Sequence, residues 1–77
     1  PTLALAAGKD GLDIVAKILA QAADYLTDHG VLIVEVGNTQ EEVDAAYPNL
    51  PLTWLDFEQG GSGVFLLTAE QCRNFES

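Results

Sequence analysis

Hydrophobic positions recur with helical spacing from residue 12 to about residue 28. Apolar side chains fall on one face of this segment and charged or amide side chains on the other, which predicts an amphipathic helix packed on a core. The predicted buried face consists of Val15, Ile18, Leu19, Ala22 and Leu26. Asp10 is placed to cap the first turn, and Gly30 stands where a left-handed C-terminal cap is expected.

Residues 31–36 are apolar almost throughout, and their hydrophobicity is continuous rather than alternating. Such a run predicts a strand buried on both faces, as in a parallel sheet. Thr39 and Glu42 have the spacing of a capping box and predict a short helix to about Tyr47, which Pro48 ends.

Two further apolar runs, residues 52–57 and 64–67, flank a cluster of glycines at positions 60, 61 and 63. Glycine permits the positive φ of a tight reversal, so this segment predicts an antiparallel hairpin. Thr68 and Gln71 repeat the capping-box spacing and predict a terminal helix to about Phe75. Residues 1–11 are expected to be a small-residue lead-in with a turn at 8–11.

The resulting order, helix-strand-helix-hairpin-helix, predicts an α/β fold, because a parallel strand needs a neighbour reached by a crossover. The apolar strand at 31–36 requires partners on both edges, and the hairpin supplies one. We therefore expect the missing partners to lie N-terminal to Pro1 or in another copy of the chain. The 77 residues contain no repeat and no linker, so they form one incomplete domain.

Composition narrows the range of partners. The chain has 12 acidic and 3 basic residues, a formal net charge of -9, which argues against nucleic-acid binding through phosphate contacts by this segment. A basic partner such as a ribosomal protein would suit this charge, although acidic residues also simply keep small proteins soluble. No apolar run approaches the length of a membrane span, so no membrane partner is predicted.

In open α/β sheets, ligands bind beyond the carboxyl ends of the strands. Here this rule indicates Glu35 and the residues after it, Gly37, Asn38, Thr39 and Gln40. Glu35 either presents a polar group at the mouth of a cleft or is a strand-end carboxylate that reaches water or a helix N-terminus. The loop with Gly8, Asp10 and Gly11 either caps the first helix or cradles an anion, but it lacks the ending of a phosphate loop.

Other chemistry is poorly supported. His29 is the only histidine and Cys72 the only cysteine, so we expect no metal site and no intrachain disulfide. Cys72 has Arg73 as its one evident activating neighbour, and we expect an inert thiol. The residues of this chain contain no catalytic set. A single cysteine is compatible with a reducing cytoplasm.

Several segments, in order, resemble the C-terminal third of the HemK-like glutamine methyltransferases. Residues 1–5 and 8–13 resemble the stretch after the Asn-Pro-Pro-Tyr motif of that family, residues 30–37 resemble its fifth strand, and Gln40 matches a frequent glutamine after that strand. Residues 54–68 are similar to the closing hairpin of the branch that modifies a large-subunit ribosomal protein. The chain thus resembles a C-terminal fragment of a HemK-like, SAM-dependent ribosomal-protein glutamine N5-methyltransferase.

This resemblance implies that residues 1–77 are the C-terminal portion of a catalytic domain, part of a Rossmann-like SAM-dependent methyltransferase sheet that is incomplete on its own. The full-length enzyme of which this chain would be a fragment, here called the parent, would transfer a methyl group from S-adenosylmethionine (SAM) to a glutamine side-chain amide of a large-subunit ribosomal protein in the cytoplasm. The family's SAM-binding glycine loop, ribose-binding acid and Asn-Pro-Pro-Tyr motif are absent here. The isolated chain is therefore expected to be inactive, with no catalytic or cofactor-binding residue of its own.

Gly8, Asp10, Gly11 and Glu35 are the candidates for the substrate-side wall of the parent's site. An unpaired sheet edge would promote self-association of the isolated chain. The alternative is a free-standing acidic protein-binding module without catalysis. A chain that contains no methionine and starts at Pro1 is compatible with a processed initiator and with a cut from a longer protein.

Overall fold

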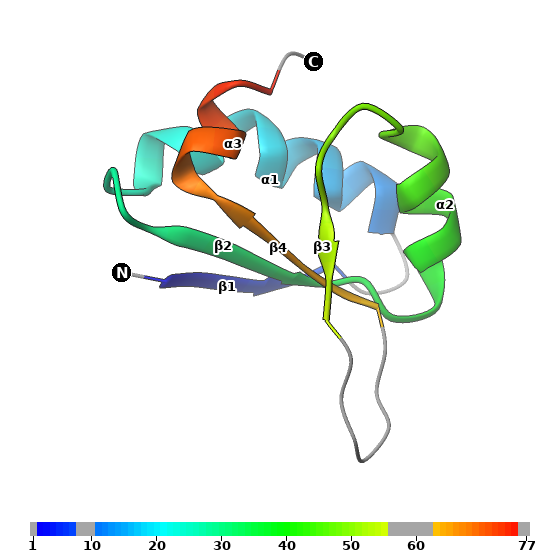
Figure 1. Ribbon diagram of the computed structural model, residues 1–77. Helices are drawn as coiled ribbons and strands as arrows, with labels where there is room; N and C mark the ends of the chain where they lie inside the picture. The colour runs from blue at the N-terminus through cyan, green and yellow to red at the C-terminus, as the bar shows by residue number, and fades with distance from the viewer. Residues whose placement is uncertain (1, 8–10, 56–62, 76–77) are drawn as a thin grey trace.

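The computed structural model describes residues 2–7, 11–55 and 63–75. These residues form a four-stranded sheet in the order β1-β2-β4-β3, with α1 and α3 on the same side of it (Figure 1). The elements in chain order are β1 Thr2–Ala6, α1 Gly11–Tyr25, β2 Val31–Glu35, the 3-10 turn η2 Gly37–Thr39, α2 Gln40–Ala46, β3 Thr53–Trp54, β4 Val64–Thr68 and α3 Ala69–Arg73.

β2 is hydrogen-bonded on both edges, to β1 in parallel and to β4 in antiparallel orientation. The prediction that residues 1–11 are only a lead-in is therefore wrong, because Thr2–Ala6 forms β1. The second partner of β2 lies within the chain, not N-terminal to Pro1 or in another copy. The register explains the pairing: Leu3 and Leu5 stand beside Leu32 and Val34, so the leucines of β1 extend the same apolar face.

The two faces of the sheet differ in burial. Leu32 and Val34 of β2, with Phe65 and Leu67 of β4, are fully buried on the face that packs against the helices. The alternate positions, such as Ile33 and its register partner Leu66, are only half-buried. Burial of the predicted strand on both faces is thus correct for one face only, because the described helices leave the other face open.

The first helix is confirmed, although it ends at Tyr25 rather than near residue 28. Its predicted inner face is correct: Val15, Leu19 and Ala22 are buried, and Ile18 and Leu26 pack against the same core.

Gly30 is not a left-handed cap, since the positive φ values among the described glycines belong to Gly37 and Gly63. Its N–H donates to the Thr27 carbonyl at 2.9 Å, and its own carbonyl accepts from the Ala69 N–H at 3.0 Å. Gly30 therefore ties the entrance of β2 to the start of α3.

The two predicted capping boxes have opposite outcomes. At the start of α2, Thr39 makes no capping bond; its hydroxyl donates to the Val36 carbonyl at 2.7 Å, because the η2 turn precedes the helix. At the start of α3 the box is formed: the Gln71 N–H donates to Thr68 Oγ1 at 3.1 Å, and the Thr68 N–H donates to Gln71 Oε1 at 2.9 Å. Thr68 is also the last residue of β4, so the strand passes directly into the helix, which ends at Arg73 instead of Phe75.

The predicted hairpin is confirmed, because β3 pairs with β4 in antiparallel orientation. Trp54 of β3 meets its register partner Phe65 edge-to-face, with ring centroids 5.5 Å apart. The predicted turn glycines at positions 60 and 61 lie outside the described residues.

The contrast between the two sheet faces predicts different costs for two neighbouring truncations. Leu32→Ala should lower the free energy of unfolding by about 3 kcal/mol, because it empties a fully buried site. Ile33→Ala in the same isolated chain should cost only about 1 kcal/mol, since that side chain is half-exposed. Urea denaturation of both variants checks this; equal losses would mean that the outer face is covered in solution.

Candidate functional site

The carboxyl ends of β1 and β2 meet at one edge of the sheet, because the two strands are parallel. Glu35, the last residue of β2, stands in register with Ala6 of β1 and with Val64 of β4. The Ala7 N–H donates to the Glu35 carbonyl at 2.8 Å, which extends this pairing by one residue beyond β1. The Glu35 side chain is exposed, so it presents a carboxylate to solvent at the strand end.

Of the four predicted substrate-side residues, Glu35 lies at this edge and Gly11 is the first residue of α1. Gly8 and Asp10 lie outside the described residues, as does the predicted capping role of Asp10. Ala7, the residue before Gly8, is bonded to Glu35, so the described chain approaches the predicted loop from the Glu35 side. The expectation that these four residues share one wall stays a prediction.

A backbone contact between two glycines shapes the same edge, and sequence reasoning missed it. The Gly63 carbonyl accepts from the N–H groups of Val36, at 2.6 Å, and of Gly37, at 3.2 Å. Gly63 has a φ of 76°, and a Cβ there would overlap the Gly37 carbonyl oxygen and lie 2.7 Å from the Gly37 nitrogen. Only glycine fits at position 63. The sequence does show that each of the two glycines borders a predicted strand. That position was interpreted for Gly63 only as part of the hairpin turn, not as a contact with Gly37.

The chemistry that this edge can perform is limited. It offers the exposed carboxylate of Glu35, which can accept a hydrogen bond from an amide or a cation. No group of three or more His, Cys, Asp or Glu residues in the described ranges is arranged to hold a metal ion. The described part of this edge can therefore line and orient a polar group.

Cys72 is not a substitute nucleophile. Its side chain is buried in the core against which α3 packs. Burial raises the pKa of the Cys72 thiol, and the nearby Arg73 only partly opposes this effect. The neutral thiol is unreactive, as expected from the sequence.

No helix in the part of the chain that the structure describes is long and apolar enough to cross a membrane.

Comparison with known proteins shows which proteins this chain is similar to. The chain is homologous to one part of the ribosomal-protein glutamine methyltransferases, which confirms the predicted relationship. The relatives are named ribosomal protein uL3 glutamine methyltransferase. Those from Francisella tularensis, Neisseria gonorrhoeae and Neisseria meningitidis are each 52% identical to it over 71 residues, 92% of this chain.

The chain spans only about a quarter of the length of these relatives, 23% to 24%. No protein-family model matches it. No solved structure matches it either.

The glycine contact predicts a sharp difference between two substitutions. Gly63→Ala should lower the free energy of unfolding by at least about 2 kcal/mol, because the new methyl group meets the Gly37 backbone as well as an unfavourable φ. Gly37→Ala is the matched control: its φ is 56° but no atom lies within 4 Å of the new Cβ, so about 1 kcal/mol is expected. Denaturant titration of both variants measures the difference. Equal losses of unfolding free energy would show that the contact between Gly63 and Gly37 does not affect stability.

Proposed function

We propose that this chain is the C-terminal part of the catalytic domain of a methyltransferase that uses SAM to methylate a glutamine side-chain amide of ribosomal protein uL3. The observation that carries the proposal is the 52% identity, over 71 residues, with relatives named for that activity. Methyltransferases of this class take the methyl group from SAM, so the remaining three quarters of the parent would bind the donor. The isolated chain, which lacks a motif for SAM, is inactive in this proposal.

The unfinished sheet supports a role as part of a larger domain. β1 ends the strand order and has a free edge in the described sheet, and its side chain Leu5 is 38% exposed. On the outer face, Ile33 and Leu66 are apolar but only half-buried. We infer that the parent extends this sheet beyond β1 and covers the outer face, giving a Rossmann-like architecture. Without the parent, the free edge would lead the chain to self-associate.

The proposed role of the carboxyl edge is to line the substrate side of the parent's site. Ligands of open α/β sheets bind beyond this edge, and Glu35 is exposed there. Its carboxylate is suited to accept a hydrogen bond from the N–H₂ of a glutamine side chain, which would orient the amide nitrogen for methylation. Gly8, Asp10 and Gly11 would border the same space. The parent would work in the cytoplasm, where ribosomal proteins are made.

Methyl transfer tests this function directly. The full-length parent, incubated with purified uL3 and SAM labelled in the methyl group, should incorporate label at one glutamine, whereas the 77-residue chain should incorporate none. Mass spectrometry of uL3 identifies the modified residue. Tight binding of uL3 by the parent without any methyl transfer would refute the proposed enzymatic activity and favour a protein-binding module.

A second test concerns the completed sheet. In the full-length parent, Ile33→Ala should cost about 3 kcal/mol of unfolding free energy, as much as Leu32→Ala, because both faces of β2 are then covered. Thr53→Ala, on the outer face of the short strand β3 at the opposite edge, is a mild control. Should Ile33→Ala cost only about 1 kcal/mol in the parent, as expected for the isolated chain, the outer face is not covered there.

A further inference from the structure

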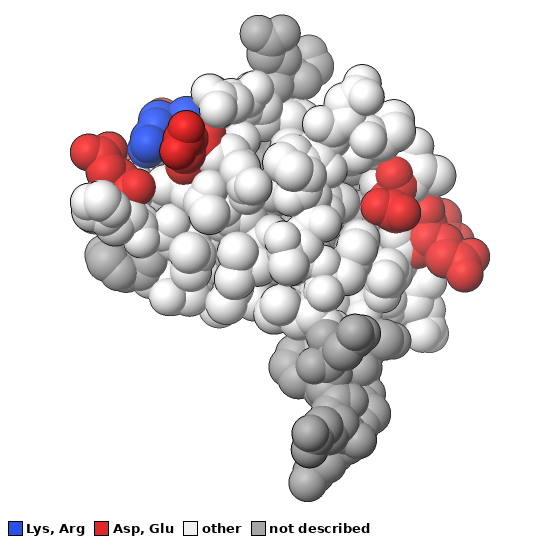
Figure 2. All heavy atoms as spheres, in the orientation of Figure 1, with Lys and Arg blue, Asp and Glu red and all other residues white. Residues whose placement is uncertain are grey.

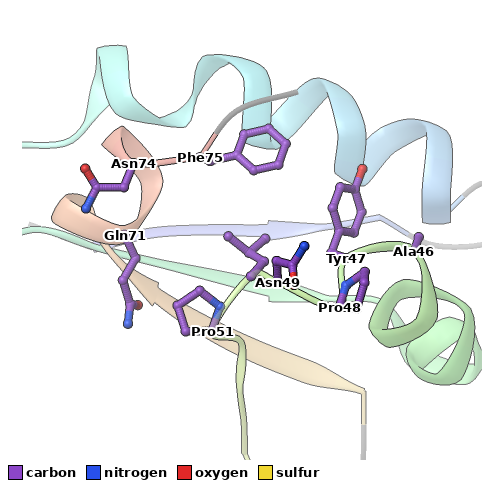
Figure 3. Close-up of a pocket in the computed structure, with 9 residues that line it drawn as sticks. Ala46, Tyr47, Pro48, Asn49, Pro51, Gln71, Asn74 and Phe75 are labelled. Carbon is purple, nitrogen blue, oxygen red and sulfur yellow. The ribbon is translucent and has the colours of Figure 1, made fainter.

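A pocket of about 480 Å³ opens between the loop after α2 and the end of α3 (Figure 3). It is separate from the carboxyl edge with Glu35, and the proposed function gives it no role. Its lining comes from residues 46–51 and from Gln71, Asn74 and Phe75.

Apolar rings and a constrained loop form much of the wall. Tyr47 and Phe75 meet edge-to-face with centroids 5.9 Å apart and an interplanar angle of 63°. The loop from Tyr47 to β3 contains Pro48 and Pro51, and a hydrogen bond from the Leu50 N–H to the Tyr47 carbonyl at 3.1 Å closes it. Proline fixes φ, so this loop has little conformational entropy left to lose on binding. The pocket is therefore preorganised for a ligand.

Besides the Tyr47 hydroxyl, the polar side chains of the wall are neutral amides, from Asn49, Gln71 and Asn74 (Figure 3). Gln71 Oε1 already accepts from the Thr68 N–H, which leaves the N–H₂ of Gln71 as a donor. The amides of Asn49 and Asn74 can both donate and accept. Apolar rings surrounded by amides match an extended polypeptide, whose backbone alternates donors and acceptors and whose side chains fill hollows.

Charge around the pocket favours a basic ligand. Exposed acidic residues of α2, Glu41, Glu42 and Asp44, precede the lining residue Ala46. Figure 2 shows carboxylates on both flanks of this face, accompanied by basic side-chain atoms on the left flank only, with uncharged surface between them. Arg73, beside the lining residue Asn74, is paired with Asp28 at 3.5 Å, so its charge is partly offset. An acidic peptide or a nucleic acid would meet like charge here.

We propose that this pocket binds an extended segment of a basic protein, with an apolar side chain between Tyr47 and Pro51, its backbone on the amides, and its lysines or arginines toward α2. The inference rests on the proposed function in one respect: it identifies that protein as uL3, since ribosomal proteins are generally basic. The pocket would bind a part of the substrate that is distant from the reacting glutamine. It would therefore add affinity without taking part in methyl transfer.

Two exposed alanines of α2 provide a matched test. Ala46 lines the pocket and Ala45 does not, so Ala46→Trp fills the pocket while Ala45→Trp adds the same side chain beside it. In the full-length parent, Ala46→Trp should raise the dissociation constant for purified uL3 at least about tenfold, the scale of a binding hot spot, and Ala45→Trp less than about twofold. Isothermal calorimetry measures both. Glu42→Lys on α2 should weaken binding more than the control Asp24→Lys, which makes the same charge change on α1, and the difference should shrink at high salt.

Each outcome decides the proposal. Equal dissociation constants for the Ala46→Trp and Ala45→Trp variants would overturn it. So would a melting temperature of the parent that falls with Ala46→Trp alone, because another segment of the parent would then occupy the pocket. Methyl transfer is assayed separately: a parent that binds uL3 through the pocket without methylating it refutes the proposed function but supports this surface. A parent that methylates uL3 and whose two variants both bind uL3 as tightly as the unmodified parent supports the proposed function but refutes this binding surface.

Discussion

The hydrogen bonds along both edges of β2 hold the rest of the molecule in place. On one edge they fix β1 in parallel register, and on the other they fix β4 in antiparallel register. This double pairing aligns Leu32 and Val34 with leucines of β1 and with Phe65 and Leu67 of β4, which produces a continuous apolar surface for α1 and α3. A slip of one residue in either pairing would turn these side chains to the outer face. The core, the carboxyl edge and the position of α3 all depend on this register.

The elements that the sequence predicted correctly are those whose signals are local. The apolar face of α1 repeats over four turns, and the Thr68–Gln71 box satisfies backbone groups within one turn. The elements that it missed depend on partners far along the chain. β1 is short and rich in alanine, which has little intrinsic preference for a strand, so its identity follows from the neighbouring β2. Gly30 likewise looked like a helix cap, but its carbonyl is committed to Ala69.

The candidate site was predictable to a smaller extent. The rule for α/β sheets located Glu35 correctly at a carboxyl edge, because it needs only the direction of one strand. The contact between Gly37 and Gly63 and the pocket between the loop after α2 and the end of α3 were not predictable, since each joins segments at least 20 positions apart in the chain. Reactive chemistry is absent from the described edge, and the identity with the uL3 methyltransferases covers about a quarter of those proteins. In the function proposed above, this part of the parent binds and orients the substrate.

The junction between β4 and α3 limits how this chain can change in evolution. Thr68 ends the strand and caps the helix, so no connecting residue separates the two elements. An inserted residue here would rotate α3 by about 100° about its axis, since one helical turn takes 3.6 residues. Cys72 would then leave the core and Phe75 would leave Tyr47. Length variation among related chains should therefore collect in the loops and avoid this junction, where a deletion or insertion is more damaging than most substitutions.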